Sequence, residues 1–324
     1  MSIKYYIKNS SITKPLYHWF KNFKKEIIRA SRTSFHGKFI NRQKGLEKLC
    51  IVLAGYKEYL YPAVFGRIKA YMEDDIDVCI ITSGKWSDTV DEICKEQNWS
   101  YLSTKENDVS LVQNVAINLH KNAKFIYKLD EDIFVTKGYF KNMFNAYLRA
   151  CESRYNPGVI APLLNINGFT YLIVLEKLGL VGEYESRFGK AKYSTTENDI
   201  IQNSPEVARF FWGEGGVVPD IDTMNAIFSK GETKEIACSI RFSIGAILFE
   251  RSLWESMDYF RMVRGTNSLG VDEADICRYC CLISKPLMVS ENVVVGHLSF
   301  GPQNATMKQY YLENKSMFDY VDSD

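Results

Sequence analysis

The chain has 324 residues, of which 46% are hydrophobic and 24% charged, with a net charge of +1. These values are typical of a soluble globular protein with a core large enough to need no disulfides, and they argue against an overall basic nucleic-acid binder. The eight cysteines lie at irregular spacings, which indicates reduced thiols in a cytoplasmic protein. Aromatic residues reach 14%, which fits a sugar-binding cleft but fits a dense core better.

The first 48 residues form a basic segment, with twelve Lys or Arg against two acids, a net charge of +10 on a body that carries −9. Apolar side chains recur in it at helical spacing, namely Leu16, Trp19, Phe20, Phe23, Ile27 and Ile28. Two interpretations stay open: a helix that contacts a membrane through residues 14–48, or a terminal helix docked on its own domain. We expect no signal peptide and no membrane-spanning helix, and therefore a cytoplasmic location, at the inner membrane face on the first interpretation.

From residue 49 to residue 132 the pattern alternates between strands and helices. We expect strands at 49–54, 78–82, 100–103 and 125–129, and helices at 61–72, 87–96 and 109–121. Strict alternation predicts an α/β fold with a mostly parallel, Rossmann-like sheet flanked by helices. In such sheets ligands bind beyond the carboxyl ends of the strands, where Asp130, Glu131 and Asp132 follow the fourth strand.

The alternation fades after residue 151 and returns with strands at 243–249 and 293–295 and helices at 253–260 and 272–282. The chain therefore divides into a basic segment 1–46, a domain 47–301 with halves 47–150 and 151–301, and a tail 302–324 that we expect to pack loosely. Residues 156–238 show no regular pattern and are predicted to be an insertion.

Asp130 and Asp132 are candidates for holding a metal ion. Two carboxylates one residue apart at the end of a strand can bind a hard cation and leave its other positions open for phosphate oxygens, as Mg²⁺ and Mn²⁺ prefer. The Asp-x-Asp pattern also occurs three times elsewhere, at residues 75–77, 220–222 and 322–324, where a solvated turn is the simpler interpretation. Only residues 130–132 end an apolar strand at the ligand edge.

A histidine and a group of three acids accompany the motif at residues 130–132. His297 follows the strand at 293–295 and could complete the ligand set of the metal, although a lone histidine more often binds a backbone carbonyl. Asp272, Glu273 and Asp275 occupy the first turn of a helix, a place that the helix dipole favours for carboxylates in any protein. Neighbouring carboxylates also raise one another's pKa, which suits a general base.

These features, in this order, resemble the glycosyltransferases of the GT-A fold, particularly the inverting family-two enzymes, over about residues 49–301. The segment 107–135 is similar to that family's helix with an asparagine followed by a strand ending in Asp-x-Asp, Gly245 falls in its glycine-containing strand, and residues 272–276 match its base motif. The chain departs from the family at Leu53–Lys57 and at Ser83–Gly84, and its base motif is Asp-Glu, not Glu-Asp. It lacks the Gln-x-x-Arg-Trp motif of processive synthases, which favours single additions.

The resemblance implies a role for each matched residue. Asp132, with Asp130 and His297, would hold Mn²⁺ or Mg²⁺, and Glu273, or else Asp272, would be the base. The residues implied to contact the nucleotide-sugar, with a UDP-sugar favoured, are Ala54, Tyr56, Ser83, Asn114, Asp130 and Glu131. An acceptor wall is expected from Trp212, Glu214 and Asp275, with Phe210, Phe211, Asp220 and Asp222 near it, and an ordinary packed insertion is an equally good interpretation of residues 210–222.

The function implied is metal-dependent transfer of a sugar from a nucleotide-sugar to a hydroxyl of a glycan or lipid-linked glycan, with inversion, in cell-surface polysaccharide assembly. Two alternatives remain from the residues. A nucleotidyltransferase can share the sheet and its carboxylates but needs a glycine-rich phosphate loop, of which Gly55-Tyr56-Lys57 is a poor version. A catalytically inactive carbohydrate-binding or scaffold protein would need no intact carboxylates.

Overall fold

The computed structural model describes residues 13–193, 199–263 and 270–320. Within these residues ten strands form one sheet in the order β1-β4-β3-β2-β5-β9-β7-β10-β6, with β8 paired to β10. The strands are β1 Gly37–Ile40, β2 Lys48–Ala54, β3 Ile76–Ser83, β4 Ser100–Thr104, β5 Phe125–Asp130, β6 Ile133–Phe134, β7 Val159–Leu164, β8 Glu235–Ala237, β9 Ala246–Glu250 and β10 Leu287–His297. The pairings give β2, β3, β4, β5, β7 and β10 one common direction, so the sheet is mostly parallel.

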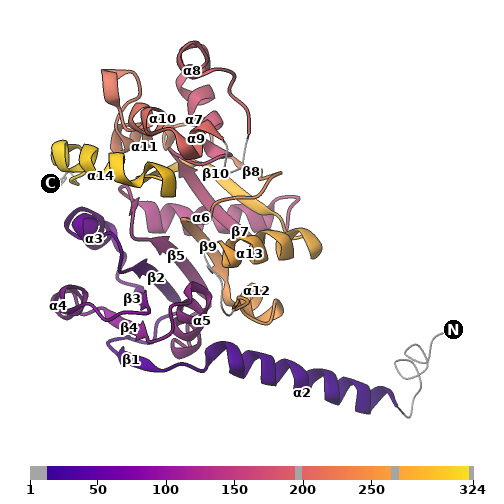
Figure 1. Cartoon of the computed structure of the whole chain (residues 1–324). Coiled ribbons are helices and arrows are strands. Elements are labelled where there is room, and N and C mark those ends of the chain that lie inside the picture. The colour runs from indigo at the N-terminus through magenta and orange to yellow at the C-terminus, as the bar shows by residue number, and fades with distance from the viewer. Residues whose placement is uncertain (1–12, 194–198, 264–269, 321–324) are drawn as a thin grey trace.

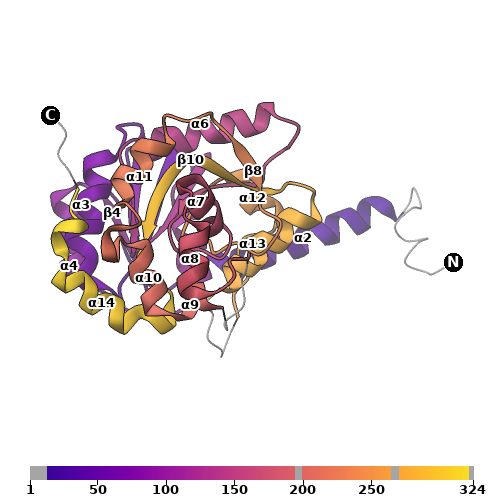
Figure 2. The same ribbon diagram turned by 90° about the horizontal axis from the view of Figure 1, so that it is seen from above.

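Helices flank this sheet (Figures 1 and 2). They are α2 Lys14–Thr33, α3 Tyr61–Tyr71, α4 Asp88–Glu96, α5 Val109–Leu119, α6 Tyr139–Glu152, α7 Thr170–Leu178, α8 Val181–Phe188, α9 Ile200–Asn203, α10 Pro205–Phe211, α11 Ile221–Phe228, α12 Arg251–Ser256, α13 Val271–Leu282 and α14 Asn304–Glu313. In the described part of the chain, none of these helices has the length and apolar character needed to cross a bilayer. The α/β class predicted from the sequence is confirmed.

The first half follows the predicted alternation closely. Ser87 caps α4 by accepting a hydrogen bond from Val90 N–H, and Asp108 caps α5 by accepting one from Leu111 N–H, so both helices begin where their capping residues predict. The strands β2 and β3 are buried along nearly their whole length, as apolar parallel strands covered on both faces must be.

The second half differs more from the prediction. β10 has 11 buried residues instead of three, because its polar segment Ser290–Asn292 forms a register irregularity within the strand and does not end it. β7 was missed because Pro162 interrupts its apolar run. Pro162 has no N–H to donate, and β9 pairs with β7 only through Val159 and Ile160.

The C-terminal segment packs on the body, so the prediction of a loose tail is wrong for residues 302–320. Met307 and Phe318 are fully buried. The buried Arg67 of α3 donates to the carbonyl oxygens of Phe318 at 2.8 Å and Asp319 at 2.8 Å and forms an ion pair with Asp222 at 2.7 Å. These bonds hold Phe318 and Asp319 against α3.

The predicted N-terminal segment divides into two parts. β1 adds an antiparallel edge strand to β4, and Asp77 accepts hydrogen bonds from the backbone N–H groups of Lys44, Gly45 and Leu46 at 2.7–2.9 Å. Residues 37–46 therefore belong to the body. Only α2 extends away from it, as both views show (Figures 1 and 2), and residues 1–12 lie outside the described residues.

Candidate functional site

The Asp130–Asp132 turn lies between β5 and the short strand β6. Asp130 N–H donates to Gly245 O at 2.9 Å, which ties the end of β5 to the segment before β9. Ile133 of β6 pairs with His297 at the end of β10, and Leu298 N–H donates to Asp132 O at 3.1 Å. Antiparallel pairing of β6 with β10 thus brings the two predicted metal-binding segments together.

The side chains of Asp132 and His297 face each other, with Asp132 Oδ2 3.6 Å from His297 Nε2. His297 Nδ1 lies 2.9 Å from the carbonyl oxygen of Ile166, and a carbonyl can only accept, so Nδ1 carries a proton. In the neutral ring the lone pair is therefore on Nε2, which lies 3.6 Å from the Asp132 carboxylate. A carbonyl that fixes the tautomer in this way is typical of metal-binding histidines.

Lys57 supplies the positive charge beside this pair in the structure. Its ammonium donates to Asp132 Oδ2 at 2.5 Å. Burial by itself would raise the pKa of Asp132, but the charge of Lys57, the neighbouring His297 and the hydrogen bond from Lys57 outweigh it and hold this pKa below its usual value. Asp132 is therefore an ionised carboxylate, the form that binds a cation.

Glu131 and Asp130 are held by other groups. The Glu131 carboxylate accepts hydrogen bonds from Gly55 N–H at 2.8 Å and Tyr56 N–H at 3.0 Å, so it fixes the turn after β2. Asp130 Oδ1 accepts from Lys128 Nζ at 2.6 Å. Burial raises the pKa of both carboxyl groups, and the charge of Asp132 adds to the rise in each case.

The three acids of α13 have different partners. Glu273 forms an ion pair with Arg241 Nε at 2.5 Å, and burial raises its pKa in spite of that arginine. Asp272 accepts a hydrogen bond from Gln113 Nε2 at 2.8 Å. Asp275 lies 3.3 Å from the guanidinium of Arg261.

The α13 acids and the Asp130–Asp132 turn share one region. The charge of Asp272 contributes to the raised pKa of Asp130, and the charges of Asp272 and Glu273 both act on the buried Lys128. Lys128 also donates to Ile244 O at 2.9 Å, beside Gly245, which falls in the glycine-containing strand of the resemblance. The buried Lys128 is thus near enough to both acidic stretches for their charges to act on it.

Four other residues predicted to contact the nucleotide-sugar are spread over the body. Ala54 is buried at the end of β2. The exposed Tyr56 and the buried Ser83 both donate to Asn107 Oδ1, at 3.0 and 2.9 Å, and so form a polar cluster at the ends of β2 and β3. Asn114 is fully buried, and its amide bonds Phe260 O at 2.8 Å and Trp254 Nε1 at 2.8 Å, so its polar atoms are engaged inside the protein.

The predicted acceptor wall needs correction. Trp212 is 2% exposed, and its Nε1 donates to His297 O at 3.1 Å, so it supports the histidine from behind and cannot face an acceptor. Phe210 and Phe211 are buried among aromatic neighbours. They belong to α10, which is the packed insertion of the alternative interpretation.

The acids near that wall have structural partners. Glu214 is exposed and forms an ion pair with Arg209 at 3.0 Å. Asp220 caps α11, and Asp222 pairs with Arg67. With Asp77 holding the backbone of residues 44–46, the competing Asp-x-Asp matches at 75–77 and 220–222 have structural explanations, while residues 322–324 lie outside the described residues.

The residues present fit a divalent cation that shares its ligands with phosphate. In the described part of the chain no group of three or more His, Cys, Asp or Glu side chains is arranged to hold a metal ion. Asp132 and His297 supply one oxygen and one nitrogen donor. Mg²⁺ in phosphate-binding sites usually has only one or two protein carboxylates and takes its remaining ligands from phosphates and water, so a two-donor site agrees with this use.

Sequence reasoning missed the three basic residues of the site, Lys57, Lys128 and Arg241. Lys128 carried a signal, because it is a charged residue inside an otherwise apolar buried strand, two positions before Asp130. Lys57 carried a weak one, because it ends the poor phosphate loop Gly55-Tyr56-Lys57, and Arg241 carried none, since it lies in an irregular segment whose course the sequence does not define.

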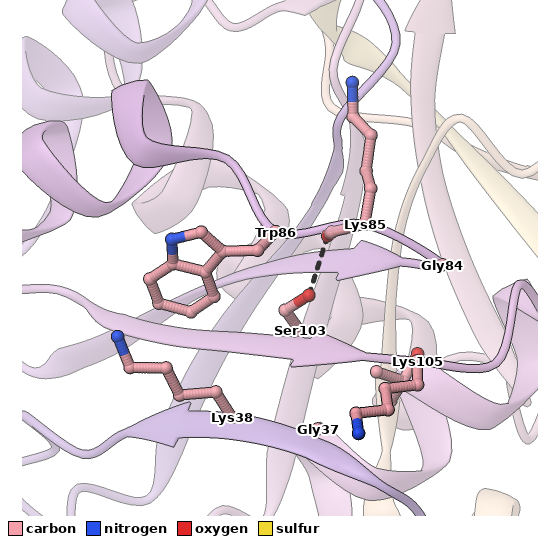
Figure 3. Close-up of a pocket in the computed structure, with 8 residues that line it drawn as sticks. Gly37, Lys38, Gly84, Lys85, Trp86, Ser103 and Lys105 are labelled. Atoms are coloured by element: carbon pink, nitrogen blue, oxygen red, sulfur yellow. Dashed lines mark hydrogen bonds between the residues drawn. The ribbon is translucent and has the colours of Figure 1, made fainter.

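A separate cavity of about 360 Å³ lies beside Gly84 and Trp86, between β1, β4 and the end of β3 (Figure 3). Lys38 Nζ sits 3.9 Å from the Trp86 ring centroid, and Ser103 Oγ donates to Lys85 O at 2.7 Å. The lysine already occupies a face of the indole ring. None of the described residues that line this cavity belongs to the predicted site.

Comparisons with known proteins yield no matching family model and no matching curated protein. Among solved structures, the chain is similar to a mannosyltransferase, PcManGT from Pyrobaculum calidifontis in complex with GDP-Man and Mn²⁺, at 11% identity and a TM-score of 0.47, covering 92% of this chain and 68% of that one. It is also similar to S. aureus TarS 1-349 in complex with UDP-GlcNAc, at 10% identity and a TM-score of 0.47, covering 80% and 61%. Likeness at this level assigns no activity, substrate or cofactor to this chain, which spans less than two thirds of the TarS chain.

Proposed function

We propose that this chain is a metal-dependent glycosyltransferase that moves a sugar from a nucleotide-sugar to a hydroxyl of a glycan or lipid-linked glycan. The observation that carries the proposal is the pair formed by Asp132 and His297, an ionised carboxylate 3.6 Å from Nε2 of an imidazole whose other nitrogen is bonded to the carbonyl oxygen of Ile166. The pair lies at the carboxyl end of β5, the edge where parallel sheets bind ligands.

Asp132 and His297 would hold Mn²⁺ or Mg²⁺, with Asp130 as a second carboxylate at the same turn. The bound cation would offset the negative charge that develops on the departing nucleotide. Lys57 adds a positive charge beside Asp132, which favours an anionic diphosphate there. The polar cluster of Tyr56, Ser83 and Asn107 at the neighbouring strand ends would contact the nucleotide-sugar, with a UDP-sugar favoured.

Glu273 is the proposed base, with Asp272 as the alternative. Its carboxylate would take the proton of the acceptor hydroxyl while the hydroxyl oxygen bonds to the anomeric carbon and the bond from that carbon to the nucleoside diphosphate breaks. Attack from the face opposite the leaving group gives inversion. The raised pKa of Glu273 brings its proton affinity closer to that of a working base.

The proposal extends to single additions in cell-surface polysaccharide assembly at the cytoplasmic face of the membrane. The resemblance to family-two enzymes and the basic N-terminal segment support this context. The division into a nucleotide-sugar half 47–150 and an acceptor half 151–301 belongs to the same proposal. The acceptor side would then be formed by α13, without Trp212.

The test is release of nucleotide from a panel of nucleotide-sugars, including UDP-GlcNAc and GDP-Man, with Mn²⁺ and with EDTA. We expect Mn²⁺-dependent release from at least one donor, lost in Asp132→Asn. A nucleotidyltransferase would instead join a nucleoside triphosphate to a sugar phosphate and release pyrophosphate. An inactive binding protein would show no release above background, and full activity in EDTA would remove the metal from the proposal.

A further inference from the structure

Helix α2 is attached to the body through its polar side. Arg29 Nε lies 3.2 Å from Asp258 Oδ1, and Arg32 Nη1 donates to Asp258 O at 2.6 Å and Tyr259 O at 3.0 Å. Lys25 Nζ is 3.6 Å from the same Asp258 carboxylate. Lys25, Arg29 and Arg32 recur at the spacing of one helical face, so this face holds the helix on the segment after α12.

The opposite face of α2 carries an apolar stripe that the body leaves uncovered. The stripe consists of Leu16, Trp19, Phe20, Phe23 and Ile27. These five side chains are 52–57% exposed, and α2 contains no buried residue. At 100° per residue the centre of this stripe lies about 180° from the face that carries Arg29. An amphipathic helix that belongs to a domain normally docks by its apolar face, so the interpretation of α2 as a terminal helix docked in that way does not hold.

The stripe is a continuous aromatic surface. The Trp19 ring stacks on Phe23 with centroids 5.4 Å apart and contacts Phe20 at 4.9 Å. Contiguous exposed apolar surface of this kind marks an interaction site in a folded protein. Each of the five side chains is more than half exposed, so the stripe is accessible along its length, and the helix that carries it extends beyond the body in both views (Figures 1 and 2).

The net charge of α2 indicates which kind of partner binds the stripe. The helix carries six Lys or Arg against the single acid Glu26, a net charge of +5. Lys24 borders the stripe and Lys21 lies further round, where their long stems can place ammonium groups beside lipid head groups. A second copy of the chain would bring two such helices of like charge together. An anionic bilayer surface complements both the stripe and the charge.

We infer that α2 lies in the interface of an anionic lipid membrane, with Trp19, Phe20 and Phe23 inserted among the acyl chains, and that its polar face holds the body against the surface. The stripe covers one side only, so the helix lies in the membrane plane and does not span it. This inference is independent of the proposed sugar transfer, because binding to a lipid surface needs no donor, metal or acceptor.

The experiment is flotation of the full chain with vesicles of phosphatidylcholine, with and without phosphatidylglycerol. The variant Trp19→Gln/Phe23→Gln removes two rings of the stripe without changing charge, and His18→Gln/Asn22→Gln is its matched control, with the same i, i+4 spacing on an exposed part of the polar face. We expect wild type to bind phosphatidylglycerol vesicles, the first variant to lose more than about tenfold in affinity, and the control to stay within about twofold.

Replacing Lys21 and Lys24 with Gln should weaken binding to anionic vesicles by about fivefold per lysine and leave binding to pure phosphatidylcholine unchanged. Thermal melts establish that each variant is folded. Equal vesicle binding by the Trp19→Gln/Phe23→Gln variant and its control would overturn the inference. So would absence of vesicle binding together with a concentration-dependent dimer that the Trp19→Gln/Phe23→Gln variant abolishes, since the stripe would then bind a second copy.

Discussion

Asp132 Oδ2 lies 3.6 Å from His297 Nε2, although Asp132 follows β5 and His297 ends β10, which are far apart in the sequence. The contact exists because Ile133 pairs with His297 across β6 and β10. Trp212 closes the back of this contact by donating to His297 O, and Ile166 O fixes the ring by accepting from Nδ1. The orientation of both side chains is therefore set by the fold before any ligand binds.

A substitution at Gly296 tests whether Trp212 packs against the strand that ends at His297. A Cβ at position 296 would lie 2.4 Å from Cη2 of Trp212, so Gly296→Ala forces the indole to move. We expect a loss of about 1–3 kcal/mol in the free energy of unfolding, measured in urea. Adding Trp212→Phe should recover part of the loss by removing the clashing ring edge. Gly182→Ala is the control, because no atom lies within 4 Å of its added Cβ; equal stability of the two alanine variants would contradict the packing described.

Lys57 competes with a cation for Asp132. In Lys57→Met the carboxylate keeps its burial but loses the ammonium at 2.5 Å, so the metal-free protein should lose about 3 kcal/mol. Added Mn²⁺ should then raise the melting temperature of this variant more than that of wild type. Lys85→Met, which removes an exposed ion pair with Glu58 at 3.4 Å, should change neither quantity measurably. An equal Mn²⁺ shift in wild type and Lys57→Met would exclude the competition.

Glu273 predicts a pH dependence. Burial raises its pKa above the ordinary 4.5, and a base must be deprotonated, so the transfer rate should fall on the acid side with a midpoint above that value. Glu273→Gln should lower kcat by about 10²–10⁴-fold. Rates of nucleotide release, measured across pH for wild type and for Glu273→Gln, give both the midpoint and the loss in kcat. A profile that stays flat down to the ordinary glutamate pKa would rule out Glu273 as the base.

The same raised pKa has a consequence for stability. The folded state holds the Glu273 proton more tightly than the unfolded chain, so wild type loses stability as pH rises between the two pKa values. Glu273→Gln lacks this loss, and its stability relative to wild type should increase over that window. Glu96→Gln, an exposed position on α4, should follow wild type at each pH in thermal melts.

Arg67 holds the C-terminal segment. Its guanidinium is fully buried and bonds Phe318 O, Val135 O and the Asp222 carboxylate. Arg67→Met leaves Asp222 without its partner and should cost about 3–5 kcal/mol, with faster hydrogen exchange in residues 304–320. Arg149→Met removes a partly exposed pair with Glu235 and should cost about 1 kcal/mol or less. Unchanged exchange in α14 of Arg67→Met would show that other contacts hold the tail.

The sequence predicted the first half of the fold well because its strands are continuous apolar runs and its helices begin at capping side chains such as Ser87 and Asp108. It predicted β10 too short, because Glu291 and Asn292 are buried polar residues whose partners lie far away in the chain. Asn292, for example, bonds the carbonyl oxygen of Phe228, which no local pattern reveals.

The sequence singled out Asp130, Asp132 and His297 because residue type and strand end coincide there, and the structure brings the side chains of Asp132 and His297 within 3.6 Å of each other. Trp212 was misplaced because an aromatic run beside glycines fits a binding wall and a core equally well. Trp212 belongs to the core because Gly296, more than 80 residues away, lets its ring approach closely and because its Nε1 donates to His297 O. The pairing of Lys57 with Asp132 and of Arg241 with Glu273 depends on loop conformation and could be found only in three dimensions.

The most direct test of the central claim is the binding of Mn²⁺ in the presence of UDP, measured by the loss of the free-ion signal in electron paramagnetic resonance. The account predicts that Asp132→Asn and His297→Gln each weaken this binding by about 10–100-fold, while Asp75→Asn, from a competing Asp-x-Asp, binds as wild type does. Wild-type affinity in both site variants would contradict it.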